Sequence, residues 1–545
     1  MRKSLIIPIL VLLTLCFSSI AQAAPRVILD GQALSFDVPP TIENGRTLVP
    51  LRVIFEALGA DVQWDGSTQN ITATKDGNEI QLIIGGKAFK NGQEVPLDVP
   101  AKLINNRTVV PLRFVSEALG CKVDWEGANQ RIYISTKGED SELAKQEQLP
   151  QMKTWVKTIT TSGFNVLHCV QQTKDGGYIL TGHNKGDLYL IKLDILGNVQ
   201  WEKTYAGSMR VNIGYCVQQT SDNGYIIVGI TRPVVIRDST GHNIIFGVGN
   251  FFVNDQIGTN TDALVLKTDE NGVMQWIKTF GKQEKWINES ATSVVATKDG
   301  GCIFVGEKDY EVGKSKAWMV KLDGKGMIQW EKTYGHNISN KFNSIKQVSS
   351  GGYILAGSTS TENINSELKD DFYVVRVNEQ GDIEWERTCG GNLYDYANAV
   401  QPASDGGFVI AGKIQSFGTG EDMNALVVKL DYDGEIEWQK TYGDTGNEIA
   451  NSIIETGEGD FVVVGAIDHG ITTNYYRKAY LVKLDSKGNI LSEIVYNSQT
   501  TDWLNSIGLC YDGGYVLCGY KNYGENENNV IQAFIIKTDA SGKGI

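Results

Sequence analysis

The chain has 545 residues, a hydrophobic fraction of 41% and 60 glycines against only 11 prolines. This length exceeds one ordinary domain, and the glycine content is typical of many tight turns rather than of collagen-like or disordered sequence. The formal net charge of −14 comes from 50 lysines and arginines against 64 aspartates and glutamates. An acidic surface repels phosphate backbones, so the composition disfavours nucleic acid as a partner and leaves sugars, peptides and cations open.

The first segment, MRKSLIIPILVLLTLCFSSIAQAAP, has the pattern of a secretory signal peptide. Basic residues precede an apolar run from Leu5 to Ile20, and an A-x-A-type cleavage site ends at Ala23. We therefore expect residues 1–23 to be removed after export and the mature protein to be secreted or associated with the cell surface. No later stretch is long and apolar enough to predict a transmembrane segment. Lipidation at Cys16 is the less favoured alternative, because a lipobox requires a small residue where Leu15 stands.

Seven of the eight cysteines follow the expected cleavage site. An odd and scattered set without a C-x-x-C pair argues against a disulfide framework, even in an exported protein. We expect these cysteines to be buried small hydrophobic side chains. They are Cys121, Cys169, Cys216, Cys302, Cys389, Cys510 and Cys518.

Two similar units lie within residues 26–136. RTLVPLRVIFEALGADVQWDG begins at Arg46, and RTVVPLRFVSEALGCKVDWEG begins at Arg107. In each unit a proline precedes a helical pattern that ends at a glycine, because proline suits the first turn of a helix and glycine the position past its end. The alternating segments that follow predict two strands. Each unit is therefore expected to fold as strand, helix, strand, strand.

The VPLR…EALG…V-x-W signature of this pair resembles the copper amine oxidase N-terminal-type domain, a stalk domain found on many exported bacterial proteins. The resemblance implies an exported accessory module. In the oxidases the copper site lies in a separate catalytic domain and needs three histidines, two of them as a His-x-His pair. The five histidines of this chain lack that spacing and lie outside residues 26–136, at His168, His183, His242, His336 and His469. The resemblance therefore implies no copper chemistry, and we expect no metal site and no cofactor.

Residues 137–151, KGEDSELAKQEQLPQ, form a charged segment that we interpret as a linker. A second repeat system follows in residues 152–545. Motifs such as WEKTY recur at intervals of about fifty residues, which is typical of propeller blades. Their first positions are Trp155, Trp201, Trp276, Trp330, Trp385 and Trp438, with Ser492 in the tryptophan's place in the last copy.

Each repeat contains an inner strand, a turn of the DGG type, an apolar strand, a variable loop, a strand that ends in KLD, a glycine turn and the WEKTY strand. The seven DGG-type turns begin at Asp175, Asp222, Asp299, Ser350, Asp405, Glu458 and Asp512. Four strands joined by tight turns cannot bury both faces of their sheet alone, whereas radial stacking buries the sheets against one another. We therefore predict a mainly β protein, in which a small duplicated α+β stalk domain precedes a seven-bladed β-propeller. The repeated tryptophan is expected to be a wedge between neighbouring blades.

The two ends of this region complement each other. The last repeat stops at KTDASGKGI, where its outer strand should start, and the first is preceded by a spare outer strand, MKTWVKT, from Met152 to Thr158. We expect this spare strand to complete the seventh blade and close the ring.

The D-x-x-G-x-x-x-W turn formed by Asp194, Gly197 and Trp201 is similar to repeats of the quinoprotein-like propellers, some of which bind pyrroloquinoline quinone and calcium. The cofactor-binding members often carry a disulfide between adjacent cysteines, and no two cysteines adjoin here. The resemblance therefore implies the architecture and not a quinone-dependent dehydrogenase. LDYDGEIE at Leu430 looks like a calcium loop, but the equivalent turns lack its second aspartate, so we interpret it as a β-hairpin turn.

Alignment of the inner strands on their turns gives one column of polar residues, which is the candidate ligand site: His168, Tyr215, Thr292, Asn343, Asn398, Asn451 and Asn505. The next column is small: Cys169, Cys216, Ser293, Ser344, Ala399, Ser452 and Ser506. The polar column has two possible roles. It lines one mouth of the channel and binds a ligand, or its asparagines cap the inner-strand turns by bonding local backbone. The first three members depart from asparagine, so specificity for a ligand is expected there.

An insertion between Gly229 and Asp262 breaks the period of the repeat. It is rich in aliphatic and aromatic residues, among them Ile244, Phe246 and Phe252. A long loop on a rigid scaffold is a natural recognition element, and a β-hairpin packed on the rim of the propeller is the alternative.

The sequence contains no Ser/His/Asp spacing and no metal-ligand cluster. We therefore expect a non-enzymatic extracytoplasmic binding or interaction protein, whose stalk associates with the cell envelope and whose propeller presents loops to a cell-wall glycan or a surface protein. The alternative is a secreted polysaccharide-active enzyme with carboxylates contributed by different blades. A mainly structural spacer in an envelope layer is a third possibility. Clustered carboxylates on one face would favour the enzyme, and a bare or apolar channel mouth would favour binding.

Overall fold

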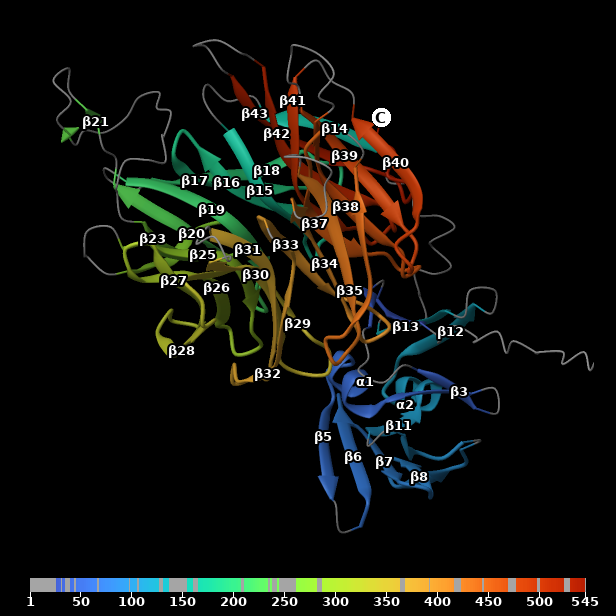
Figure 1. Cartoon of the computed structure of the whole chain (residues 1–545). Helices are drawn as coiled ribbons and strands as arrows, with labels where there is room; N and C mark the ends of the chain where they lie inside the picture. Colours follow the sequence, from blue (N-terminus) through green and yellow to red (C-terminus); the bar gives the residue numbers. More distant parts are fainter. Residues whose placement is uncertain are drawn as a thin grey trace, which may run out of the picture.

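The computed structural model describes residues 26–30, 32–34, 40–43, 46–65, 68–97, 99–104, 107–126, 131–136, 154–159, 165–206, 210–233, 236–237, 243–244, 261–281, 287–362, 368–391, 393–415, 423–443, 446–468, 477–496, 500–523 and 530–544. These residues are mainly β, with many four-stranded sheets in a propeller-like arrangement and two short helices in the N-terminal part (Figure 1). The expected signal peptide and linker lie outside the described residues, as do His242, His469 and most of the insertion.

The N-terminal part contains two strand–helix–strand–strand units, as predicted. The first comprises β4 (Arg46–Pro50), α1 (Leu51–Ala57), β5 (Asp61–Asp65) and β6 (Asn70–Lys75). The second comprises β11 (Arg107–Pro111), α2 (Leu112–Ala118), β12 (Lys122–Glu126) and β13 (Arg131–Ser135). Each helix begins directly after its proline, which therefore occupies the N-cap position and not the first turn.

Three small sheets and the two helices enclose the core of this part. The remaining strands are β1 (Arg26–Leu29), β2 (Gln32–Ala33), β3 (Thr41–Glu43), β7 (Asn78–Ile83), β8 (Ala88–Lys90), β9 (Gln93–Val95) and β10 (Lys102–Ile104). The strand orders are β12-β13-β1-β2, β10-β11-β4-β3 and β5-β6-β7-β8-β9. Each helix buries one apolar face, with Ile54 and Phe55 from α1 and Val115 from α2 fully covered.

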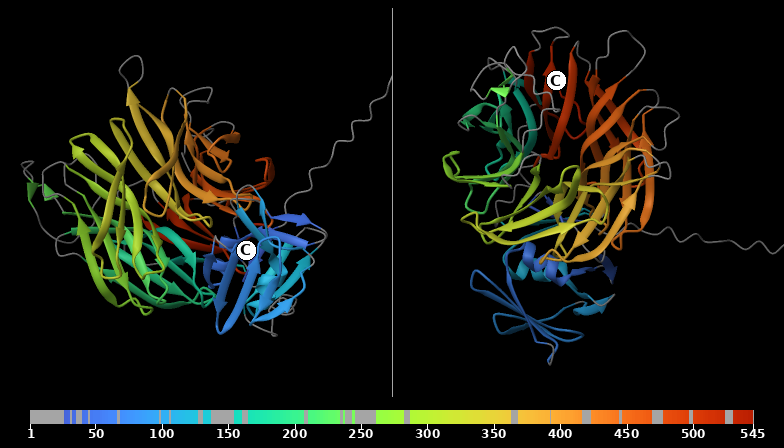
Figure 2. Two further views of the ribbon diagram at one scale, coloured as in Figure 1. Left: turned by 90° about the horizontal axis from the view of Figure 1, so that it is seen from below. Right: turned by 60° about the vertical axis from the view of Figure 1, so that its left-hand side comes forward.

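Seven four-stranded antiparallel sheets follow between Trp155 and Lys537 (Figure 2). The first to third sheets consist of β15 (Asn165–Gln172), β16 (Tyr178–Asn184), β17 (Asp187–Leu193) and β18 (Val199–Tyr205); β19 (Arg210–Gln219), β20 (Tyr225–Pro233), β23 (Asp262–Thr268) and β24 (Met274–Phe280); and β25 (Glu289–Ala296), β26 (Cys302–Glu311), β27 (Lys314–Leu322) and β28 (Ile328–Tyr334). Within the insertion of the second sheet, β21 (Ile236–Arg237) pairs with β22 (Asn243–Ile244).

The fourth to sixth sheets consist of β29 (Ser339–Gln347), β30 (Tyr353–Glu362), β31 (Leu368–Val377) and β32 (Ile383–Cys389); β33 (Asp395–Pro402), β34 (Phe408–Ile414), β35 (Asn424–Leu430) and β36 (Ile436–Tyr442); and β37 (Glu448–Glu455), β38 (Phe461–Asp468), β39 (Arg477–Leu484) and β40 (Ile490–Tyr496). The seventh contains β41 (Thr501–Leu509), β42 (Tyr515–Asn522), β43 (Ile531–Lys537) and β14 (Trp155–Ile159). Its outer strand thus precedes the first sheet in the chain, and Trp155 pairs with Lys537.

Tryptophan, lysine and tyrosine occupy alternate positions of the WEKTY strand, so all three project from one face of it. In most sheets these side chains contact the glycine turn before the outer strand of the next sheet; we call this contact the outer-strand clamp. The indole N–H of Trp438 donates to the Ser486 carbonyl at 3.0 Å. The Lys440 ammonium donates to Asn489 Oδ1 at 2.7 Å, and the Tyr442 hydroxyl to the Gly488 carbonyl at 2.9 Å.

The turn glycine leaves room for the indole of the preceding sheet. Gly434 has φ +83°, and a Cβ on it would lie 2.8 Å from the Trp385 ring. The same close approach joins Gly197 to Trp155, Gly272 to Trp201 and Gly488 to Trp438. The tryptophan therefore lies between neighbouring sheets, as predicted. Where Ser492 replaces it, Gly542 of the next sheet faces Leu481 and Ile494 instead.

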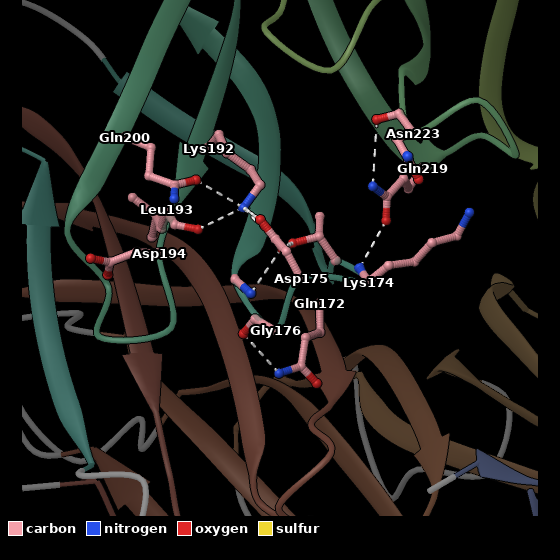
Figure 3. A network of polar contacts seen from close by, with 12 residues as sticks. Gln172, Lys174, Asp175, Gly176, Lys192, Leu193, Asp194, Gln200, Gln219 and Asn223 are labelled. Carbon is pink, nitrogen blue, oxygen red and sulfur yellow. Dashed lines mark hydrogen bonds and ion pairs between the residues drawn. The ribbon is translucent and has the colours of Figure 1, made fainter. Parts of the chain in front are cut away.

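A buried lysine from the KLD strand pairs with the aspartate of the DGG turn in five sheets, a feature that the sequence reasoning missed. Lys192 is 3% exposed, and its ammonium bonds Asp175, the Gln200 side chain and the Leu193 carbonyl (Figure 3). The other pairs are Lys267–Asp222, Lys321–Asp299, Lys429–Asp405 and Lys537–Asp512. In the fourth sheet a serine replaces the aspartate and Arg376 replaces the lysine, and the guanidinium donates to backbone carbonyls of Gly351 and Val377.

We expect Trp438→Ala to lower the free energy of unfolding by about 3 kcal/mol, because it removes a large ring and a hydrogen bond from a junction between sheets. Guanidinium unfolding followed by circular dichroism measures this change. Ser492→Ala is the matched control at the equivalent position and should change stability by less than about 0.5 kcal/mol. Equal effects of the two substitutions would contradict a specific role of the indole.

Acid should weaken the pair formed by Lys321 and Asp299. Burial opposes ionisation of Asp299, but hydrogen bonds from Lys321, Thr297 and the Gly301 N–H outweigh it and lower the pKa to about 2. A carboxylate with a lowered pKa contributes stability above its unfolded pKa and loses it as the pH falls through the folded value. The contribution of Asp299 is therefore complete above about pH 4 and lost toward pH 2.

The measurement is urea unfolding of the protein and of Asp299→Asn at several pH values across this range. The variant should be less stable at neutral pH, and its stability should fall less steeply in acid. Asp433→Asn, at an exposed turn, is the control. An acid dependence that is unchanged in Asp299→Asn would show that this pair does not contribute.

Candidate functional site

Each member of the polar column is the extra residue of a β-bulge. The ladder between the first two strands of every sheet skips one residue of the inner strand, and that residue is His168, Tyr215, Thr292, Asn343, Asn398, Asn451 or Asn505. An extra residue is left unpaired and re-aims its side chain. The bulge therefore explains why the column departs from the strand pattern around it.

Five column residues bond the backbone of the neighbouring sheet. The acceptor is the carbonyl directly before the neighbour's own bulge residue, so the contacts repeat from sheet to sheet. They are Thr292 to Phe342 at 2.7 Å, Asn343 to Ala397 at 2.8 Å, Asn398 to Ala450 at 2.9 Å, Asn451 to Leu504 at 2.8 Å and Asn505 to Leu167 at 2.8 Å. The sequence left two roles open for the asparagines, binding of a ligand or hydrogen bonds to local backbone. In the structure their amides donate to the backbone of the neighbouring sheet and not to their own turn.

His168 and Tyr215 depart from this arrangement. His168 Nε2 lies 3.4 Å from Nδ1 of His183, and the two rings are stacked with centroids 5.5 Å apart. The Tyr215 ring meets His168 edge-on at 5.3 Å. Burial and the neighbouring His183 lower the pKa of His168 to about 3, and burial and Arg232 lower the pKa of His183 to about 4. Both imidazoles are therefore neutral at physiological pH and offer hydrogen bonds without charge.

Six of the seven column residues line one cavity of about 300 Å³: His168, Tyr215, Thr292, Asn398, Asn451 and Asn505. Asn343 is not among its lining residues. These six side chains carry imidazole, hydroxyl and amide groups and no carboxylate. Such a lining can bind a neutral polar molecule through several directed hydrogen bonds.

The column of small residues also links neighbouring sheets. Ser506 Oγ accepts a hydrogen bond from the Val170 N–H at 3.2 Å, and Ser344 Oγ accepts one from the Val400 N–H at 3.2 Å. Cysteines take this position in the first two sheets, where the sulfur atoms of Cys169 and Cys216 lie 3.9 Å apart. The seven cysteines that lie among the described residues are free; Cys169 and Cys216 are half-buried and the others buried. The hydrogen bond from Cys169 lowers the pKa of the Cys216 thiol.

The turn that looks like a calcium loop is a β-hairpin turn, as interpreted from the sequence. Asp431 Oδ1 accepts hydrogen bonds from the backbone N–H groups of Asp433 and Glu435, at 3.0 Å and 2.8 Å. The carboxylate thus bonds its own turn. Within the described ranges, no group of three or more His, Cys, Asp or Glu side chains is placed to hold a metal ion. No helix in the same ranges has the length and apolar character that crossing a membrane requires.

We expect Asn451→Ala to lower the free energy of unfolding by about 1–2 kcal/mol, because it leaves the Leu504 carbonyl without its donor at a junction between sheets. His168→Asn should change stability by less than about 0.5 kcal/mol, since it places the common residue of the column at this position. Urea unfolding compares the two variants. A larger loss in His168→Asn than in Asn451→Ala would show that the histidine pair holds the fold together.

The solved structures to which this chain is similar include two with low sequence identity. Sqt1 from Chaetomium thermophilum aligns with 10% identity and a TM-score of 0.37, over 68% of this chain and 83% of that protein. A protein of unknown function from Dyadobacter fermentans aligns with 11% identity and a TM-score of 0.39, over 72% of this chain and 100% of that one. No curated protein matches the sequence.

One protein-family model matches the N-terminal part. Residues 28–134, which contain the first strand–helix–strand–strand unit and all of the second except Ser135, match the model of the copper amine oxidase N-terminal domain. This range carries the VPLR…EALG…V-x-W signature in both units. The N-terminal part of the chain is therefore similar to the copper amine oxidase N-terminal domain, and the repeated sheets lie outside the match.

Proposed function

We propose that this chain is an exported, non-enzymatic binding protein, in which a closed seven-bladed β-propeller presents one mouth of its channel to a cell-wall glycan or a surface protein. The repeated sheets support the architecture, because each has the four antiparallel strands expected of one blade. Pairing of β14 with β43 supports closure by the two ends of the region, as does the bond from Asn505 to the Leu167 carbonyl between the seventh and first sheets.

The observation that carries the binding function is the pair of departures in the polar column. Five positions keep a side chain that ties neighbouring sheets together, whereas His168 and Tyr215 form a ring cluster at the same cavity. Because both departing side chains lie at one cavity, their change in two adjacent sheets supports a role in binding a ligand. Neutral imidazoles, a phenol and amides suit the hydroxyl and amide groups of a sugar or of a peptide backbone.

The N-terminal domain is proposed to associate with the cell envelope. Its edge strand β5 exposes apolar side chains, with Trp64 53% and Val62 37% exposed. The equivalent valine of the second unit, Val123, is 8% exposed. An exposed apolar edge strand is a surface to which another chain or a wall polymer can bind.

The test is retention of the full chain on isolated cell walls and on a glycan array. The wild-type protein should bind, and a variant with His168→Asn and Tyr215→Asn should bind at least about tenfold more weakly while keeping its unfolding midpoint, because only the departing side chains are removed. Asn343→Ala, outside the lining of the cavity, is the control and should keep its affinity.

Two outcomes would redirect this proposal. Release of sugar fragments from the walls would overturn the non-enzymatic reading and favour the polysaccharide-active enzyme. Wall binding that is lost in Trp64→Ala but kept in the double variant would assign the envelope contact to the N-terminal domain alone and leave a protein as the partner of the propeller.

A further inference from the structure

A second cavity, of about 610 Å³, lies between the first and second sheets. Its lining residues come from the DGG-type turns and the strand ends beside them, from the turn between β23 and β24 and from the start of the outer strand β18. The polar column lies at the other end of the inner strands. Asp175 follows His168 by seven positions of mostly extended chain, which corresponds to roughly 20 Å. The two cavities therefore open at opposite ends of the sheets.

Asn223 distinguishes this junction from the others. The middle position of the DGG-type turn has positive φ, and six sheets place glycine there: Gly176, Gly300, Gly351, Gly406, Gly459 and Gly513. The second sheet has Asn223 at φ 64° instead, and this residue lines the cavity. A side chain in this conformation is strained relative to glycine, and asparagine is among the residues that tolerate it best. The strain is compatible with a role for the amide in the cavity.

Trp201 lines the cavity with an unused donor. At three other junctions the equivalent indole N–H donates to a turn carbonyl of the next sheet: Trp276 to Gly324 at 3.1 Å, Trp385 to Tyr432 at 3.1 Å and Trp438 to Ser486 at 3.0 Å. The Trp201 N–H has no acceptor in the part of the chain that the structure describes; the Trp155 N–H, at the junction between the seventh and first sheets, is also unpaired there, but it is buried. The Trp201 N–H is therefore free to donate to a ligand.

Other polar groups of the cavity are held in place by the fold. The buried Lys192 ammonium bonds both Asp175 and Gln200, so that these two side chains are fixed (Figure 3). Gln219 Oε1 accepts a hydrogen bond from the Lys174 N–H at 2.9 Å. Groups fixed before binding reduce the entropy that a ligand must overcome.

The charges of the lining cancel. Lys174 and Lys192 contribute two positive charges, and Asp175 and Glu270 two negative ones. The remaining polar groups are the amides of Gln200, Gln219, Asn223 and Asn271 and the indole N–H. Planar amides and carboxylates bond adjacent hydroxyl groups, while the indole offers an apolar surface beside its donor.

We infer that this cavity is a second binding site, which takes a neutral saccharide of a few sugar units. Its volume falls within the range of small-molecule sites. Glu270 and Asn271 lie on the exposed turn between β23 and β24, where they form the rim of the cavity. This site does not depend on the ligand of the polar column.

Isothermal titration of the full chain tests the inference, with maltotriose, cellotriose and tri-N-acetylchitotriose as neutral probes and trigalacturonate as the anionic comparator. At least one neutral probe should bind, and Glu270→Ala with Asn271→Ala should weaken it at least about tenfold, since both side chains are exposed and leave the fold intact. Trp201→Phe, which keeps a ring at the junction but removes the N–H, should also weaken binding.

The Glu270→Ala and Asn271→Ala variant separates this site from the polar column, because neither residue lines the cavity of that column. Lys487→Ala changes the position equivalent to Asn271 in the sixth sheet and is the control for the repeated turn; it should leave binding unchanged. The inference is overturned if no neutral probe binds, if trigalacturonate binds as tightly as the neutral probes, or if the Glu270→Ala and Asn271→Ala variant keeps wild-type affinity.

Discussion

The contact between the outer strand of one sheet and the glycine turn of the next is the constraint on which the repeated sheets depend. A strand presents alternate residues on one face, so tryptophan, lysine and tyrosine reach the same turn together. Trp438, Lys440 and Tyr442 each donate a hydrogen bond to the turn that contains Gly488. Because the indole needs the space of a missing Cβ, the tryptophan of one repeat and the glycine of the next are required together.

The inner strands provide a second tie at each junction, and the two ties fail at different places. Between the sixth and seventh sheets the clamp has lost its tryptophan, but Asn451 still bonds Leu504. Between the first and second sheets His168 has replaced the amide, but the Tyr205 hydroxyl still donates to the Gly272 carbonyl at 2.6 Å. Between the second and third, Tyr215 departs while Trp276 keeps its bond to Gly324. A junction that retains one of these two contacts tolerates the loss of the other. The side chain at the position that has lost its contact can then serve another role, such as binding a ligand.

The helices and strands could be predicted from the sequence because the same pattern of strand and turn residues recurs in every repeat. Strands, turns and the tryptophan contact each recur with one spacing, and the two N-terminal units repeat one helix between strands. The buried lysines were missed because lysine is almost always exposed, and only its pairing with a distant turn aspartate makes burial tolerable. The joint replacement of that pair at Ser350 and Arg376 was the available signal. The direction of the asparagine bonds was missed because a bulge changes the register of a strand without changing its composition.

Several departures from the repeat gather in the first two sheets, while others, at Ser350, Arg376 and Ser492, lie elsewhere. His168, Tyr215, the cysteine pair, Asn223 and the unbonded Trp201 N–H all belong to the first two sheets, and the insertion after Gly229 lies in the second. Identical units would present the same surface at every junction and would not favour one junction as a binding site. A single specific site therefore requires that the units differ. In the first two sheets the changes fall at the bulges and at the turns, while the buried strands between them keep the pattern of the other sheets. Binding is therefore expected where the repeat is least regular and the core beneath it is unchanged.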